Sequence, residues 1–185
     1  MAIGMALNGT VQNFAGGIMI LVFRPFKAGD FIEAQGFSGT VKEVTIVSTK
    51  LVTVDNRNII IPNGALSNGT INNFSQNEYR RIDWTVDVEY GCNAEQTKSL
   101  LMDIMLADSR IVNKDSGAPA DPIVALNALR DSSVQFIMKA WVKSPDYWDV
   151  NYAINEKVYT TLPLNGIQFP FPQLEVTLNT SKNNN

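Results

Sequence analysis

Residues 1–23, MAIGMALNGTVQNFAGGIMILVF, carry no charged side chain and decide the architecture of the chain. As a helix, this segment would be roughly 35 Å long, close to the thickness of a bilayer core. Polar residues such as Asn8 and Gln12 favour contact with protein or water over contact with lipid. Small residues recur from Ala2 to Gly17, so neighbouring helices can approach closely. The segment is predicted to pack against copies of itself; the alternative is an amphipathic helix docked on a soluble domain.

Composition narrows the function classes. The chain has 185 residues, 45% of them hydrophobic, with 15 basic and 18 acidic side chains and a formal charge of −3. Such a chain folds, and its charge gives no electrostatic reason to expect nucleic acid as a partner. It has no histidine, which excludes Ser-His-Asp and Cys-His catalysis. The single Cys92 is predicted to be a small buried hydrophobe. No glycine-rich phosphate loop is present, and we expect neither an enzyme nor a cofactor or metal site.

Short strands are predicted after the first helix. Residues 24–30, RPFKAGD, combine two cations, a proline and a glycine, which end a helix and begin a turn. Four short strands follow, at residues 31–33, 39–44, 49–54 and 59–61, and residues 62–64 are read as the closing turn. Strands this short, within roughly forty residues, predict a small β-barrel.

A second pattern begins near Arg80. Apolar residues alternate with polar ones along a predicted strand whose buried face is Ile82, Trp84, Val86, Val88 and Tyr90. Residues 94–107 have helical periodicity, residues 123–129 and 134–142 form a predicted hairpin, residues 147–162 a second helix, and residues 168–169 a short last strand. The order βαββαβ is that of ferredoxin-like folds.

Three acidic residues on the first strand of this pattern, Asp83, Asp87 and Glu89, project from its polar face. They could be proposed as acid–base partners or metal ligands. A solvated sheet face is the favoured interpretation, because nothing in the pattern desolvates them.

The end of the chain holds a strand without a partner. The alternating residues are Leu174, Glu175, Val176, Thr177 and Leu178, after the rigid sequence Pro170-Phe171-Pro172. A lone strand is unstable, so we expect it to pair with another chain.

Several motifs resemble the small-conductance mechanosensitive channel (MscS) family. They are, in order, NGTVQNFAGG at residues 8–17, FRPFKAGD at 23–30, GTV at 39–41, ST at 48–49, DNR at 55–57, IPNG at 61–64 and NNFS at 72–75. They cover nearly the whole chain at family spacing.

The resemblance implies a multi-domain fold. Its parts would be a pore-lining transmembrane helix over residues 1–27, an Sm-like β domain over 28–75 and an α+β ferredoxin-like domain over 76–172. A C-terminal strand over 173–180 would join a β-barrel shared between subunits, followed by a disordered tail over 181–185. Because the sequence begins within the pore helix, we expect a fragment whose Met1 need not be native.

Roles for individual residues follow from the same resemblance. Met1 and Met5 match the pore constriction, and Gly4 and Ala6 match small positions where pore helices pack. Gly9 matches the kink of the pore helix, and Leu7 and Val11 match contacts with outer helices that transmit force. Methionine replaces the leucine usual in the family at Met5, and a flexible thioether fills a constriction less rigidly.

The resemblance therefore implies a membrane-tension-gated channel for ions and small osmolytes, with weak selectivity, that relieves hypo-osmotic stress. Its partners would be identical subunits in a homoheptamer and the lipid bilayer, without nucleic acid. It would lie in the bacterial inner membrane, with the part after the pore helix in the cytoplasm. The alternative is a soluble ring-forming module that binds RNA or a small effector; the acidic balance and charge-free N-terminus oppose RNA.

Overall fold

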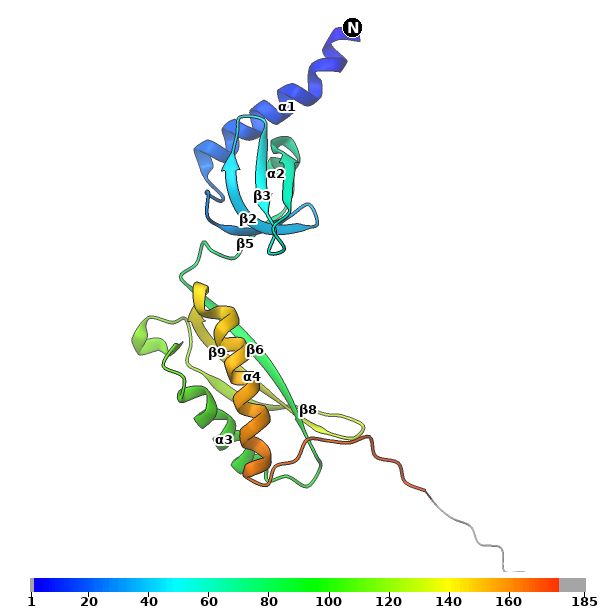
Figure 1. Cartoon of the computed structure of the whole chain (residues 1–185), viewed down its shortest axis with the longest axis vertical. Coiled ribbons are helices and arrows are strands. Elements are labelled where there is room, and N and C mark those ends of the chain that lie inside the picture. Colours follow the sequence, from blue (N-terminus) through cyan, green and yellow to red (C-terminus); the bar gives the residue numbers. More distant parts are fainter. Residues whose placement is uncertain (1, 177–185) are drawn as a thin grey trace, which may run out of the picture. The chain divides into compact units, whose positions relative to one another are not determined.

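The computed structural model describes residues 2–176, and the side chains of residues 8–176. The chain divides into two compact units, Met1–Arg80 and Arg81–Asn185. Figure 1 shows the elements of both units.

The first unit joins a long helix to a small β domain. Helix α1 (Ala2–Phe23) runs without interruption through Gly9. In the part of the chain that the structure describes, no helix has both the length and the apolar character needed to cross a membrane. The β domain is one antiparallel sheet in the order β4-β3-β2-β1-β5, with helix α2 beside it. Its strands are β1 (Phe31–Ala34), β2 (Phe37–Val44), β3 (Ser48–Val52), β4 (Asn58–Pro62) and β5 (Ile71–Asn73).

Two elements of this unit differ from the sequence prediction. Residues 62–64 were expected to form a closing turn, whereas helix α2 (Asn63–Asn68) begins there. Strand β5 was not predicted; it pairs with β1, with Ala34 opposite Ile71. The four predicted strands are present, displaced by at most two residues at their ends. The core of the unit includes Ile20 and Phe26, so the end of α1 belongs to the β domain.

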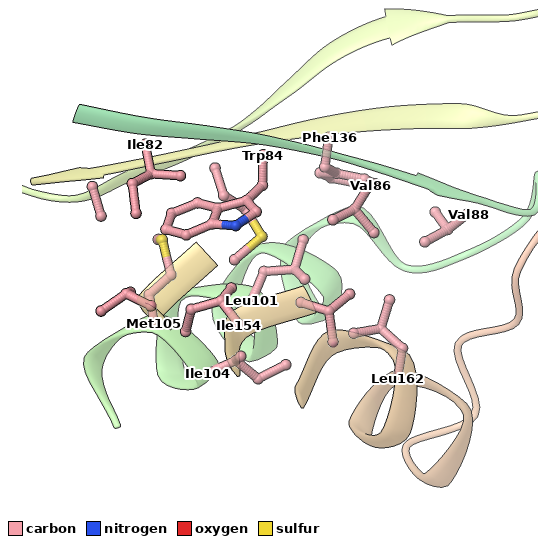
Figure 2. Packing of buried hydrophobic residues seen from close by; sticks show 14 of the residues in the cluster. Ile82, Trp84, Val86, Val88, Leu101, Ile104, Met105, Phe136, Ile154 and Leu162 are labelled. Carbon is pink, nitrogen blue, oxygen red and sulfur yellow. The ribbon is translucent and has the colours of Figure 1, made fainter. Parts of the chain in front are cut away.

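The second unit is a sheet covered by two helices. Its elements are β6 (Tyr79–Val88), α3 (Ala94–Leu106), β7 (Ile111–Val112), β8 (Ile123–Leu129), β9 (Val134–Lys143) and α4 (Tyr147–Leu164), with short 3-10 helices at Lys114–Ser116 and Ser144–Asp146. Strand β9 is central, with β6 as one neighbour, while β8 and β7 pair with successive parts of it. Helices α3 and α4 lie on one face of this sheet (Figure 2).

The apolar periodicity located the core of this unit. Ile82, Trp84, Val86 and Val88 are all buried, as predicted, and they pack against Ile154 and other residues of the helices (Figure 2). Tyr90 was placed on the same face but is exposed, because β6 ends at Val88. Cys92 is half-buried against the core.

The predicted last strand is not formed. Residues 167–176 have no regular secondary structure, and a backbone hydrogen bond from the Glu89 N–H to the Gln168 carbonyl at 3.0 Å links them to the residue that follows β6. The structure therefore supplies βαββα of the predicted βαββαβ order, with the added short strand β7. The Sm-like and ferredoxin-like descriptions of the two units stay predictions.

Candidate functional site

Helix α1 approaches the β domain closely at two adjacent glycines. A Cβ added to Gly17 would lie 2.0 Å from the backbone oxygen of Ile46, and one added to Gly16 would lie 2.6 Å from that of Asn63. Real Cβ atoms do not approach a backbone oxygen so closely, so only glycine allows this packing. The two glycines form a flat face on α1 against which the 45–47 loop and α2 rest.

Asn63 organises the other side of this contact. Its side chain is fully buried; Oδ1 accepts from Thr49 Oγ1 at 2.8 Å, and Nδ2 donates to the Thr45 carbonyl at 2.9 Å. Its backbone N–H donates to the Val47 carbonyl at 3.0 Å. These bonds satisfy a buried amide and fix the 45–47 loop in the position that meets Gly17.

A hydrogen bond also joins the two elements directly. The side-chain oxygen of Asn13, on α1, accepts from the backbone N–H of Gly64 at 2.9 Å, across 51 positions of sequence. Gly64 is the second residue of α2, and the first N–H groups of a helix lack partners within the helix. Asn13 thus acts as a cap supplied from another helix. We call Asn13, Gly16, Gly17, Asn63 and Gly64 the helix–β junction.

A buried carboxylate fixes the turn that follows α1. Asp30 is 6% exposed, and its Oδ2 accepts from the Lys27 backbone N–H at 3.1 Å and from Asn73 Nδ2 at 2.9 Å. Asn73 Nδ2 also donates to the Pro25 carbonyl at 3.1 Å. Strand β5 is thereby tied to the exit of α1, with Phe26 buried beneath.

Contact with the β domain is confined to the end of α1. Among residues 8–23, the buried ones are Gly16, Gly17 and Ile20, while residues 8–12 are exposed. A Cβ at Gly9 would meet nothing within 4 Å. Within residues 8–23, whose side chains the structure describes, the contacts that anchor the helix lie between Asn13 and Ile20.

The predicted pore residues lie in the other half. The side chains of Met1, Gly4, Met5, Ala6 and Leu7 fall outside the described part of the chain. Val11 is 61% exposed, and its predicted contact with outer helices is not made by the residues that the structure describes. The roles assigned to these residues stay predictions.

The predicted oligomerisation strand is only partly described. Leu174 and Val176 are 91% and 74% exposed, and Glu175 between them is also exposed, without strand pairing. Thr177 and Leu178 lie outside the described residues. Pairing of this segment with another chain stays a prediction.

Charged side chains form structural pairs in the second unit. Asp108 is 7% exposed and accepts from Arg110 Nη2 at 2.7 Å; hydrogen bonds from Arg110 lower the pKa of this carboxyl. Lys157 of α4 lies 3.9 Å away, so the cluster joins α4 to the end of α3. On the sheet face, Asp83 pairs with Arg81, and Asp87 accepts from Ser133 and Gln135. In the described part of the chain, no group of three or more histidine, cysteine or acidic residues could hold a metal ion.

Sequence reasoning missed the helix–β junction. The motifs at residues 8–17 and 61–64 were each recognised, but no pattern within either indicated that they touch. The signal available was the pair Gly16-Gly17, since two adjacent glycines in an apolar helix mark a close approach of backbone.

Two family models match the chain. The model for the mechanosensitive ion channel beta-domain matches residues 9–76, and the model for the C-terminal part of the mechanosensitive ion channel MscS matches residues 82–169. The helix–β junction lies wholly within the first match.

Relatives match almost the whole chain in sequence and in structure. The small-conductance mechanosensitive channel of Edwardsiella ictaluri is 40% identical over 178 residues, which cover 96% of this chain and 60% of the relative. The crystal structure of Helicobacter pylori MscS in its closed state superposes with a TM-score of 0.88 at 28% identity, covering 97% of this chain and 70% of that one. Arabidopsis thaliana MSL1 shares the fold, with a TM-score of 0.76 at 16% identity, 93% of this chain and 62% of that one. The chain spans about 60% of the length of the curated relatives it matches.

Proposed function

The chain belongs to the MscS family of mechanosensitive channels, and from this premise we propose that it forms the pore helix and cytoplasmic cage of a channel opened by membrane tension. It conducts ions and small osmolytes with weak selectivity and relieves hypo-osmotic stress. It is a channel subunit and not an enzyme. Identical subunits assemble around the pore as a homoheptamer in the bacterial inner membrane, with the part after the pore helix in the cytoplasm.

The observation that carries this proposal is the one-ended anchoring of α1. The helix is held by the β domain from Asn13 to Ile20, whereas residues 8–12 are exposed to solvent in the single subunit. The exposed side of α1 also carries Val11, Phe14 and Ile18, and a charge-free apolar surface of this kind does not remain exposed in an assembled protein. Copies of α1 cover one another around an axis, and each helix can move about its fixed end.

The gate lies in the unanchored half. Rings of Met1 and Met5 form a constriction narrow and apolar enough to lose its water, which blocks ions without a plug. Gly4 and Ala6 are the small positions that let adjacent helices pack closely. Tension favours the state with the larger area in the membrane plane, and the helices then separate.

Gly9 separates the mobile half from the anchored half. It is the only residue of α1 between Leu7 and Val11 that tolerates non-helical backbone angles at little cost. A kink there lets the first part of the helix line the pore while the second part stays on the β domain. Leu7 and Val11 flank the kink and pass force from outer helices of a full-length parent.

The C-terminal segment closes the cage. Leu174 to Val176 are exposed in the single subunit, and together with Thr177 and Leu178 they contribute one stave of a barrel shared by the subunits. Cyclic symmetry gives each such strand two neighbours and leaves no free edge.

Recording from a full-length parent in membrane patches tests this function. Suction on the patch should open channels that pass both cations and anions, and cells lacking their own such channels should survive an osmotic downshock when they express the parent. Patches that contain the protein but carry no tension-activated current contradict the proposal. The same patches without the protein serve as the control.

A further inference from the structure

The turn between β3 and β4 is an ordered, exposed projection of the β domain. It comprises residues 53–57, and the side chain of Val54 is 91% exposed. An apolar side chain at such a tip gains nothing in an isolated subunit. The turn itself is nevertheless held in one conformation by hydrogen bonds.

Hydrogen bonds close this turn from both sides. The Thr53 N–H donates to the Arg57 carbonyl and the Asn56 N–H to the Thr53 carbonyl, each at 2.9 Å. The Arg57 N–H donates to Thr53 Oγ1 at 2.9 Å, and Arg57 Nε donates to Asp55 Oδ2 at 2.7 Å. Asp55 also accepts from Thr53 Oγ1. A projection ordered before binding loses little conformational entropy when it docks.

A hollow lies at the opposite edge of the same sheet, beside β1 and β5. It has a volume of about 330 Å³ and is lined by Glu33, Ala34, Gln35, Gly36, Thr70 and Asn72, from the β1–β2 turn and the start of β5. The Gln35 side chain donates to the Ala65 carbonyl at 2.9 Å, which fixes part of its rim. We call it the β1–β5 hollow.

The projection and the hollow lie at the same end of the sheet. Thr40 pairs with Val52 and Phe37 with Ala34, so residues 53–57 extend alongside residues 37–39, next to the β1–β2 turn. In the strand order, β4 and β5 are the two edges. Two copies set side by side in the same orientation, with β4 of one next to β5 of the other, would place the projection of one copy at the level of the hollow of its neighbour.

The β3–β4 turn and the β1–β5 hollow also carry opposite charges. Glu33 lines the hollow, and the Arg57 side chain beside Val54 is 70% exposed. A guanidinium can pair with a second carboxylate while it stays bonded to Asp55, because it has five donors.

We infer that the β3–β4 turn of one subunit docks in the β1–β5 hollow of the next copy of this chain, with Val54 in the hollow and Arg57 facing Glu33. This contact is heterologous, as a closed ring requires. The inference rests on the proposed assembly of identical subunits and specifies one of its contacts.

Disulfide trapping tests the contact on the whole chain in detergent. The pair Val54→Cys and Thr70→Cys is introduced together with Cys92→Ser, so that no other thiol is present. Oxidation should give a ladder of covalent multimers that ends at the size of the ring. The matched control, Val54→Cys with Lys42→Cys, uses an exposed residue of β2 and should give no ladder.

A charge exchange tests the pairing separately. In the trapping background, Arg57→Glu and Glu33→Lys should each lower the yield of multimers by about fivefold, since a surface ion pair contributes up to ~1 kcal/mol. Combining the two should restore the yield. Arg57→Glu also removes the bond to Asp55, so rescue by Glu33→Lys distinguishes pairing between subunits from damage to the turn.

The outcomes separate this inference from the function on which it rests. Light scattering gives the mass of the assembly without any cross-link. A ring-sized mass without a ladder overturns the contact and leaves the assembly intact, and covalent dimers alone show a two-fold contact and also overturn it. A monomeric mass contradicts both the contact and the proposed assembly.

Discussion

Gly17 is the residue on which the closeness of α1 and the β domain depends most. A methyl group there would meet the Ile46 backbone oxygen at 2.0 Å, and backbone cannot move aside as a flexible side chain can. Gly9 is a matched control in the same helix, because a methyl group there meets nothing within 4 Å.

Gly17→Ala should therefore lower the free energy of unfolding by about 1–3 kcal/mol through overpacking. Gly9→Ala should raise it by up to ~1 kcal/mol, because alanine is the better helix former. Thermal or denaturant unfolding of the whole chain in detergent measures both changes. Equal effects of the two substitutions would contradict the proposed close contact at Gly17.

In a full-length channel, Gly9 should also affect gating. Gly9→Ala favours a straight helix in every subunit, so it should alter closing or desensitisation although it stabilises the helix. Recordings indistinguishable from those of the unmodified channel would argue against a kink at Gly9.

At the scale of elements, the predictions succeeded where the pattern was local. The alternation through Val134, Phe136 and Met138 defines β9 and its buried face, and the four-residue steps of Val150, Ile154 and Val158 define α4. In each case the periodicity of the backbone is repeated in the side chains.

Elements formed by non-local contacts could not be predicted in this way. Helix α2 has six residues and no extended periodicity, and its first turn is completed by Asn13, 51 positions away from Gly64. The three residues of β5, Ile71, Asn72 and Asn73, show no strand pattern of their own and form a strand because β1 offers an edge. Conversely, the Gln168 carbonyl accepts from the Glu89 N–H just beyond β6, but residues 168–169 form no strand.

The ion pairs of Asp108 with Arg110 and Lys157 make the packing of α3 against α4 depend on pH. Hydrogen bonds from Arg110 lower the pKa of Asp108 in the folded protein below the ordinary 3.8. A carboxyl whose folded-state pKa is lowered contributes stability above its unfolded pKa, and this contribution is lost as pH falls through the folded pKa.

Asp108→Asn should accordingly lower the free energy of unfolding by about 2 kcal/mol at neutral pH, where the charged hydrogen bonds are intact. The difference between the two proteins should shrink as pH falls through and below 3.8. Chemical denaturation at a series of pH values measures it. A difference that stays constant down to the lowest pH would show that the charge of Asp108 does not stabilise the fold.

At the scale of the whole molecule, the proposed assembly depends on contacts between subunits, which a single subunit does not contain. Leu174 and Val176 are almost fully exposed in the single subunit, after the stiff Pro170-Phe171-Pro172 sequence. Deletion of residues 173–185 should loosen the oligomer, which light scattering in detergent at micromolar concentration would show as a lower mass on dilution. If the truncated chain keeps the same number of subunits on dilution, the C-terminal strand does not hold the assembly together.

The candidate site could be predicted in part from the sequence. The charge-free residues 1–23 indicated a helix that needs other chains around it, and the family motifs supplied roles for Met1, Met5 and Gly9. The helix–β junction and the β1–β5 hollow could not be predicted, because both are built from segments that are distant in sequence.

We propose that the first half of α1 forms the gate of a pore, and the threshold tension of a Met5 variant is the measurement that decides this. A polar group in an apolar ring lowers the cost of holding water there, so Met5→Ser in a full-length parent should open at lower tension or leak at rest. Heptamer yield is measured on the same preparations, because a packing role for Met5 would reduce the yield instead. A lower threshold with a normal yield is the result that this account predicts, and an unchanged threshold with a normal yield would contradict it.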